Sequence, residues 1–191
     1  MEIKDLRLFK TMPTLFTDRL ILRGITKQDA QDIFDYSKRK ETTKYLLWYP
    51  HISLRDTKRH IALVLKKYKR CEYYDFAIQL RDSGKMIGTC GFTRLNPLDD
   101  IGEIGYVINP SYQNRGYATE AVKRIIKFGF EELLLERIEA RYIIGNDASL
   151  RVMKKCSMTE EGVLRNGIKA KGIMRDVGVC SILYSEYISS A

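Results

Sequence analysis

One segment, residues 102–121, constrains the fold of this chain more than any other. It begins with the alternating stretch Gly102–Ile108, which is typical of a β-strand. Asn109-Pro110 then ends the strand, because proline has no N–H to donate and restricts the residue before it. Apolar residues at helical spacing follow from Ala118 to Gly129. The sequence therefore predicts a strand that leads through a short loop directly into a long helix.

A loop at such a junction is suited to binding a phosphate group. The first amides of a helix have no intrahelical acceptor, and the positive end of the helix dipole adds to their attraction for an anion. Gly116 lets an anion approach the backbone closely, and Ala118 keeps the first helical turn narrow. Each hydrogen bond to a charged group contributes about 1.5–3 kcal/mol, so several amides together can hold a pyrophosphate without a lysine.

The pattern along the chain predicts one mixed α/β domain at residues 17–187, preceded by a variable leader at residues 1–16. We expect a mixed central sheet of about six to seven strands with helices on both faces, because helices come first, an antiparallel meander follows, and a strand–helix–strand order closes the chain. Strands are expected at 19–23, 73–80, 86–94, 102–108, 137–144, 159–165 and 177–184, and helices at 27–39, 54–70, 117–134 and 147–156.

The loop also carries a recognisable signature. It has neither the G-x-x-x-x-G-K-[ST] pattern of a P-loop nor the G-x-G-x-x-G pattern of a dinucleotide site. It contains Gln113-x-x-Gly116-x-Ala118, and the run NPSYQNRGYATEAV resembles the coenzyme A-binding strand, loop and helix of the GNAT superfamily of N-acetyltransferases. The resemblance is greatest to the RimJ/RimL-like group, which acetylates N-terminal amines of ribosomal proteins and other amines. It extends over about residues 18–187, and Asn146-Asp147-Ala148-Ser149 matches the N-x-x-S of that group.

The resemblance implies direct transfer of an acetyl group from acetyl-CoA to a primary amine, with no covalent enzyme intermediate and no metal. It places the coenzyme A pyrophosphate against the loop, and the pantetheine arm against the preceding strand and the next strand–helix junction. The residues concerned are Tyr106, Val107, Ile108, Gln113, Asn114, Arg115, Gly116, Tyr117, Ala118, Thr119 and Asn146.

The candidate catalytic residues each have an alternative explanation. In many superfamily members a tyrosine on the last helix protonates the departing thiolate, but Met153 stands there, and we expect Ser149 to replace it directly or through water. Ser149 and Asn146 equally suit a simple helix start. Glu103 is the candidate general base acting through water, although a strand glutamate often has no catalytic role. Ser157-Met158 replaces the usual Gly-Phe after this helix, so we expect a distorted helix end.

Composition limits the remaining classes of function. The net charge of +9 comes from residues 1–70, which hold 17 Lys and Arg against 8 Asp and Glu, whereas residues 71–191 balance. A basic surface attracts an anionic partner and repels a polycationic one. Four scattered cysteines, two histidines and the lack of a recognition motif argue against disulfides, a metal site and nucleic acid as a direct ligand. With no signal peptide and no apolar span, we expect a soluble, cytoplasmic protein that does not bind membranes.

The nature of the acceptor depends on how strong a base the chain can offer. Deprotonating a lysine side chain at pH 7 costs about 4.6 kcal/mol, but an α-amino group costs only about 1–1.4 kcal/mol. The segment that carries the signature has no histidine and one candidate carboxylate. A weak base suits an α-amine, so we expect a protein or peptide N-terminus as acceptor, on an acidic or ribosomal protein. Trp48 and Tyr49 are candidates for a substrate lip or for core packing. Two alternative functions stay open: a small-molecule amine acetyltransferase and a non-catalytic coenzyme A-binding module. A homodimer is the open alternative to a monomer.

Overall fold

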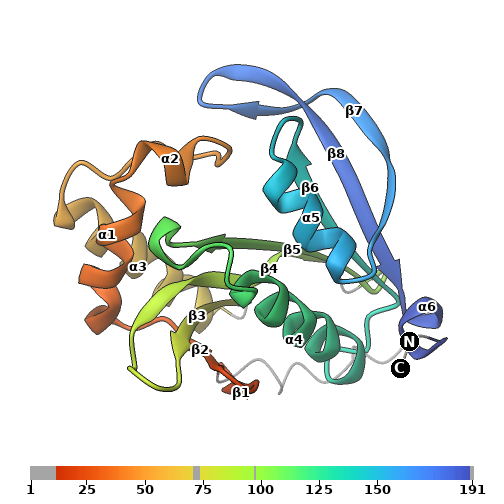
Figure 1. The fold of residues 1–191 in the computed structure, drawn as a ribbon, viewed down its shortest axis with the longest axis horizontal. Coiled ribbons are helices and arrows are strands. Elements are labelled where there is room, and N and C mark those ends of the chain that lie inside the picture. Colours follow the sequence, from red (N-terminus) through yellow and green to blue (C-terminus); the bar gives the residue numbers. More distant parts are fainter. Residues whose placement is uncertain (1–11, 71–73, 97, 190–191) are drawn as a thin grey trace.

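The structure is a computed structural model that describes residues 12–70, 74–96 and 98–189, and Figure 1 shows its ribbon. Within these ranges, eight strands form one sheet in the order β1-β2-β3-β4-β5-β6-β8-β7. The strands are β1 (Leu15–Phe16), β2 (Leu20–Gly24), β3 (Tyr74–Leu80), β4 (Met86–Asn96), β5 (Ile101–Ile108), β6 (Arg137–Ile143), β7 (Thr159–Ala170) and β8 (Ile173–Leu183). The helices are α1 (Ala30–Ser37), α2 (Lys40–Thr43), α3 (Leu54–Lys69), α4 (Tyr117–Glu131), α5 (Asp147–Lys155) and α6 (Tyr184–Ser189), with 3-10 turns η2 (Lys27–Asp29) and η3 (Pro110–Tyr112).

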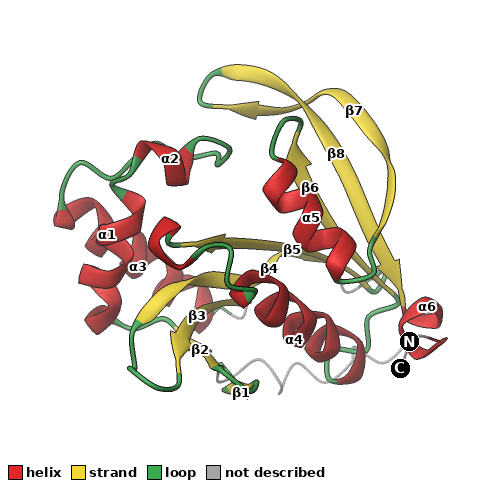
Figure 2. Ribbon diagram, viewed as in Figure 1, coloured by secondary structure: helices red, strands yellow, loops and turns green. Residues whose placement is uncertain are grey.

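Helices cover both faces of the sheet, as the sequence predicts. In β3, Phe76 and Ile78 join the core that includes α4, whereas Ala77 between them joins the core that includes α1 and α3. This division follows from the period of two in a strand, which sends successive side chains to opposite faces. In Figure 2, α1 and α3 lie beside the β2–β4 part of the sheet, and α5 lies beside β6. The mixed α/β class is confirmed, with one strand more than the upper expected number.

The closing hairpin is longer than predicted. We expected strands at 159–165 and 177–184, but β7 and β8 continue until only Lys171 and Gly172 join them. Both turn residues have positive φ, at 52° and 84°, as a two-residue type I′ hairpin turn requires. Most of β7 is exposed, so its sequence lacks the alternating apolar residues that indicate a half-buried strand.

Near the N-terminus the structure adds detail that the sequence did not provide. Residues 1–11 of the expected leader lie outside the described residues, while Leu15 is 2% exposed and pairs with β2. The first predicted helix begins as η2 and continues as α1, and α2 was not predicted. Arg23 on β2 holds the carboxylate of Asp29 at the start of α1 with two hydrogen bonds of 2.9 and 2.7 Å.

Two further sequence expectations concern thiols and membranes. Cys90, Cys156 and Cys180 are free and buried, as expected of reduced thiols that pack as small apolar groups, and Cys71 lies outside the described residues. Burial raises the pKa of the Cys156 thiol to about 12. In the described ranges, none of the helices combines the length and the apolar character that crossing a membrane requires.

The sheet contains a gap between β5 and β6, the two parallel neighbours. Their pairing runs from Ile101 opposite Arg137 to Ile104 opposite Ala140 and stops there. Both strands continue, β5 to Ile108 and β6 to Ile143, without pairing to each other. The strands therefore diverge, and the loop before α4 and the start of α5 lie at the open end of the gap (Figure 1).

Candidate active site

The loop that connects β5 to α4 is held in place by side chains from its own first half. Asn109 Oδ1 accepts a hydrogen bond from Ser111 N at 3.1 Å, which forms η3. Gln113 Nε2 donates to Ile108 O at 3.1 Å, so the first residue of the signature fixes the loop to the end of the strand. Asn114 and Gly116 then adopt positive φ values of 60° and 82°, and α4 begins at the next residue.

This conformation leaves a run of six backbone amides without an acceptor in the described ranges. Gln113 N–H donates to Pro110 O at 3.3 Å, but in the part of the chain that the structure describes the N–H groups of residues 114–119 donate to no protein atom. They lie at the N-terminal end of α4, where the helix dipole is positive. Alternating backbone conformations with convergent N–H groups form an anion-binding concavity. The local geometry is therefore that of a phosphate site.

An arginine that the sequence analysis missed supports the loop from behind. Arg19 Nη1 donates to Arg115 O at 3.1 Å, and Arg19 Nη2 forms an ion pair with Glu120 at 2.6 Å. Its guanidinium lies 4.6 Å from the centre of the Tyr117 ring. A Cβ atom at Gly116 would lie 3.3 Å from Arg19 Nη2. Arg19 uses the carbonyl side of the loop and leaves its amides available to a ligand.

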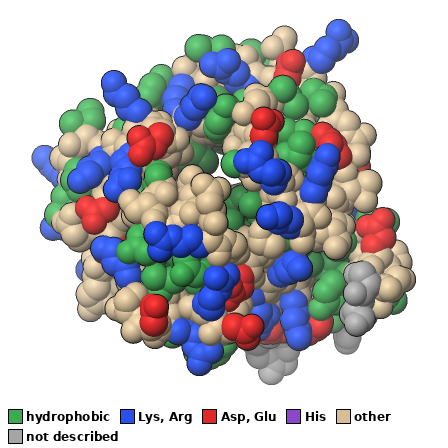
Figure 3. All heavy atoms as spheres, viewed as in Figure 1, with side chains coloured by type: hydrophobic (Ala, Val, Ile, Leu, Met, Phe, Trp, Pro, Cys, Tyr) green, Lys and Arg blue, Asp and Glu red, His purple; other side chains and the backbone are tan. Residues whose placement is uncertain are grey.

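Two cavities meet at the gap between β5 and β6. The loop-side cavity, about 430 Å³, is lined by the loop, the start of α4 and one face of α5. The hairpin-side cavity, about 540 Å³, is lined by β5, β6, the region after α1 and residues of the closing hairpin. Figure 3 shows this face of the molecule hollowed between the part that contains α1–α3 and the part that contains α5 and β6. Both cavities are lined by Tyr45, Leu46, Tyr106, Val107, Asn146 and Ser149.

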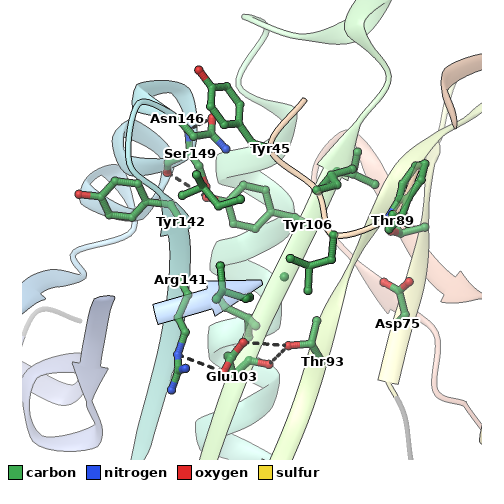
Figure 4. A pocket seen from close by; sticks show the side chains of 18 of the residues that line it. Tyr45, Asp75, Thr89, Thr93, Glu103, Tyr106, Arg141, Tyr142, Asn146 and Ser149 are labelled. Carbon is green, nitrogen blue, oxygen red and sulfur yellow. Dashed lines mark hydrogen bonds and ion pairs between the residues drawn. The ribbon is translucent and has the colours of Figure 1, made fainter. Parts of the chain in front are cut away.

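Ser149 and Tyr106 are in direct contact where the cavities meet (Figure 4). The Tyr106 hydroxyl lies 2.9 Å from Ser149 Oγ and donates to Ser149 O at 2.9 Å. Burial is the largest cause that raises the pKa of Tyr106, although the hydrogen bond to Ser149 opposes it. Asn146 caps α5, and its side chain accepts from Ser149 N at 3.4 Å. The capping role considered for Asn146 is thus present, and the sequence analysis had not foreseen the contact between tyrosine and serine.

Glu103 lines the hairpin-side cavity but is already engaged. Its carboxylate lies 3.3 Å from Arg141 Nε and 3.5 Å from the Thr93 hydroxyl. In Figure 4, these three residues lie at one end of the drawn cavity, and Ser149 and Asn146 lie at the other. The cavity thus contains both candidate catalytic residues, and the ion pair leaves Glu103 less available as a base than its sequence position suggested.

The end of α5 is regular, so the expected distortion was wrong. Ser157 adopts φ 61°, the left-handed conformation that glycine usually provides at this position. Ser157 N–H donates to Lys154 O and Met158 N–H donates to Met153 O, both at 3.1 Å, which is the hydrogen-bond pattern of a Schellman motif. Met153, which replaces the usual tyrosine, is 1% exposed in the core and presents no acid to either cavity.

Two histidines line the hairpin-side cavity, although they lie far from the signature in the sequence. His51 Nδ1 lies 2.9 Å from Ser37 Oγ and 2.8 Å from Thr57 Oγ1. Its ring centre is 6.0 Å from that of His60 and 5.3 Å from that of Trp48. Burial lowers the pKa of both histidines, which makes them weak bases that are neutral at pH 7. Trp48 also lines this cavity.

The closing hairpin reaches across the hairpin-side cavity. Lys171 at its tip donates through Nζ to Thr43 O, and Tyr49 Oη donates to Lys171 O at 3.3 Å. Ile168 and Val177 of the same hairpin line the cavity. In the described ranges, no group of three or more His, Cys, Asp or Glu side chains could hold a metal ion.

Comparison with known proteins identifies the class to which this fold and site belong. Residues 19–159 match the Acetyltransferase (GNAT) domain family. The uncharacterized N-acetyltransferase p20 from Bacillus licheniformis is 34% identical over 176 residues, which is 92% of this chain and 99% of the relative. A crystal structure of a GNAT-family acetyltransferase from Bacillus anthracis has a TM-score of 0.81 at 28% identity, over 91% of this chain and 100% of that chain.

A second structure shares the fold alone. RimL, a ribosomal L7/L12 α-N-protein acetyltransferase in complex with coenzyme A, has a TM-score of 0.80 at 18% identity, over 91% of this chain and 99% of that chain. The fold and the strand–loop–helix site thus define an acyltransferase. The chain belongs to the GNAT family of N-acetyltransferases.

Proposed function

We propose that this enzyme transfers an acetyl group from acetyl-CoA, bound in the loop-side cavity, to the α-amino group of a peptide or protein in the hairpin-side cavity. The observation that carries the proposal is the run of unpaired amides at 114–119 beside a gap where the two cavities meet. The amides suit a pyrophosphate, and the gap lets the two substrates meet.

The open edge of β5 suits the pantetheine arm. Asn109 N–H donates to Ile87 O at 2.8 Å, so the backbone of Asn109 faces β4. Because backbone direction alternates along a strand, the N–H and C=O groups of Tyr106 face the gap, where β6 no longer pairs. An amide-bearing arm can bond to this edge as an additional strand would. By the same alternation the backbone of Ile108 faces the gap and that of Val107 faces β4, while Val107 and Asn146 both line the loop-side cavity.

The side chains at the meeting point suit direct acyl transfer. Acetyl-CoA supplies an activated thioester. An N–H group of the β5 edge would polarise its carbonyl oxygen, and the amine would form the C–N bond as the C–S bond breaks. Ser149 Oγ would give a proton to the departing sulfur, directly or through water, with Tyr106 as its hydrogen-bond partner.

Weak bases favour an α-amine acceptor over lysine. The carboxylate of Glu103 is paired with Arg141, and the two histidines in the cavity have lowered pKa values. Such groups suffice for an α-ammonium with a pKa of about 7.7–8.0 but not for a lysine near 10.4. This acceptor class would place the enzyme with the RimJ/RimL-like group, on an acidic or ribosomal protein partner.

The test is an acceptor screen with thiol release as the readout. Purified enzyme and acetyl-CoA are combined with a peptide that has a free α-amine, the same peptide with a blocked N-terminus and an internal lysine, a polyamine and a set of amino sugars. Mass spectrometry then locates the acetyl group. We expect transfer to the free α-amine. Transfer only to lysine side chains, a polyamine or another small amine would contradict the acceptor assignment and favour a small-molecule acetyltransferase.

A further inference from the structure

One arginine in the hairpin-side cavity has no partner among the residues that the structure describes. The charged side chains that line this cavity are Asp75, Arg94, Glu103 and Arg141. Arg141 lies 3.3 Å from Glu103 and 3.6 Å from Glu139, so its charge is balanced. Asp75 also has an interaction partner. Arg94 has neither an ion pair nor a hydrogen bond with any residue that the structure describes.

A β-bulge directs Arg94 into the cavity. Phe92 pairs with Ile104, but Arg94 already pairs with Glu103, so Thr93 is one extra residue in β4. Successive strand residues normally point to opposite faces, yet Thr93 and Arg94 both line the same cavity. A bulge of this kind re-aims side chains next to a site.

The carboxylate that lies opposite Arg94, that of Glu103, is bound by other side chains. The Thr93 hydroxyl donates to Glu103 O at 3.2 Å and lies 3.5 Å from its side chain. Arg141 on the neighbouring strand takes the other carboxylate oxygen of Glu103. Arg94 is therefore an exposed cation beside a fully engaged acid, and the histidines of the cavity are neutral at pH 7 because burial lowers the pKa of each. The unpaired charge that remains in the cavity is therefore the positive charge of Arg94, which a negatively charged group of a ligand can pair with.

The position of Arg94 sets the distance to the reacting amine. Arg94 lies opposite Glu103, and Tyr106 is three residues further along β5, or about 10 Å at the rise of a strand. Tyr106 contacts Ser149, where the acetyl group would be transferred. In a free amino acid only one carbon separates the amine from the carboxylate, so the carboxylate is too close to the reacting amine to reach Arg94. An extended peptide advances about 3.3–3.6 Å per residue, which places its second or third side chain near Arg94.

We propose that Arg94 is a specificity-determining residue that binds the carboxylate of an acidic side chain at the second or third position of a peptide acceptor. The proposal rests on the proposed α-amine acetylation and names the sequence that this site prefers. It also agrees with the basic N-terminal region, whose excess of Lys and Arg attracts acidic partners.

The experiment compares two peptides that differ only in charge. Both have the same N-terminal residue, followed by Glu-Glu in one and Gln-Gln in the other. The enzymes are the wild type, Arg94→Ala, Arg94→Gln and the control Arg165→Ala, which removes an exposed arginine of β7 that lines neither cavity. We expect the wild type and Arg165→Ala to have a kcat/KM at least about tenfold higher for the acidic peptide, since a hydrogen bond to a charged group has that magnitude.

Loss of Arg94 should abolish this preference by lowering the kcat/KM of the acidic peptide alone. Arg94→Ala and Arg94→Gln should keep the kcat/KM of the Gln-Gln peptide and the thermal shift produced by acetyl-CoA, which reports folding and the other cavity. Arg94→Glu should favour a Lys-Lys peptide instead. Equal use of both peptides by the wild type, or an unchanged preference in the Arg94 variants, would overturn the proposal while leaving α-amine acetylation intact. Acetylation of a polyamine and of no peptide would overturn both.

Discussion

The two cavities are built in different ways. The loop-side cavity takes its most important groups from the backbone of one continuous segment, the six amides of 114–119, with side chains only supporting them. The hairpin-side cavity takes its groups from side chains on α1, α3, β4, β5, β6 and the closing hairpin. A ligand common to a whole family can be bound by main chain, whereas a ligand specific to one enzyme must be bound by side chains that can vary. Substitutions should therefore have different effects on acetyl-CoA binding and on use of the acceptor, depending on which cavity they change.

The largest effect should come from Gly116→Glu. The substitution strains a backbone at φ 82° and places a carboxylate among the amides proposed to bind phosphate. We expect at least about a 100-fold loss of acetyl-CoA affinity in calorimetry, because two or more hydrogen bonds to a charged group are lost. Gly172→Glu is a matched control, since Gly172 has φ 84° and no atom lies within 4 Å of the place that a Cβ atom would take there. Unchanged affinity in the Gly116 variant would mean that the loop does not bind the pyrophosphate.

Ser149→Ala should separate chemistry from binding. The variant loses the hydroxyl proposed to protonate the departing thiolate, and proton transfer of this kind contributes about 100-fold or more. We expect kcat to fall by about that factor, while acetyl-CoA affinity changes less than about threefold because the amides remain. Near-normal turnover would exclude Ser149 from the mechanism.

Tyr106→Phe should have a smaller effect in the same direction. It keeps the ring and removes a hydroxyl that contacts both Ser149 Oγ and Ser149 O at 2.9 Å. Tyr106 is a positioning residue, and we expect loss of its hydroxyl to lower kcat about tenfold. This is the effect of losing one hydrogen bond between neutral groups, which contributes about 1.4 kcal/mol. Steady-state kinetics should show little change in KM for acetyl-CoA. If Tyr106→Phe lowers turnover no further in the Ser149→Ala background, the two hydroxyls act as one unit.

Asp29→Asn should weaken the wall of the hairpin-side cavity. Burial opposes ionisation of Asp29, but hydrogen bonds from Arg23 and Thr26 outweigh it and lower its pKa. Its stabilising contribution is therefore present above about pH 4, the usual carboxyl value, and is lost as the pH falls through the lower folded value. We expect the free energy of unfolding in urea to fall by about 2–3 kcal/mol at pH 7, and the difference between wild type and variant to become smaller in acid. If the difference in free energy of unfolding between wild type and variant stays constant down to the pH of acid unfolding, this account is wrong.

Ser157→Gly should have the smallest effect, and it should stabilise the protein. Ser157 has φ 61°, which costs a residue with a side chain roughly 1–2 kcal/mol. Glycine removes that strain but is more flexible in the unfolded chain, so a net gain of about 0.5 kcal/mol is expected. Thermal unfolding measures it. A loss of stability would mean that the serine side chain contributes at the end of α5.

The contrast between the cavities also explains how much the sequence could predict. The strand, loop and helix of 102–121 lie together along the chain, so local patterns were enough to locate them. Tyr106 and Ser149 are 43 residues apart, and Arg19 and Arg115 are 96 apart, so only the folded chain shows that they touch. His51 and His60 carry no local signal for a site. The exposed hairpin was underestimated for a related reason, since a strand that buries little lacks apolar alternation.

The contact between Lys171 and the segment of Thr43 and Tyr49 has a further consequence. It joins two parts of the chain that are 128 residues apart, and the hairpin that it fixes lines the hairpin-side cavity through Ile168 and Val177. A flexible chain end can enter a cavity that is partly closed in this way. A lysine in the middle of a folded surface brings two flanking segments, which must also fit into the cavity. For a polypeptide acceptor of the kind proposed, the enzyme would thus select chain ends over internal lysines by the connectivity of the polypeptide, before any difference in amine basicity is felt.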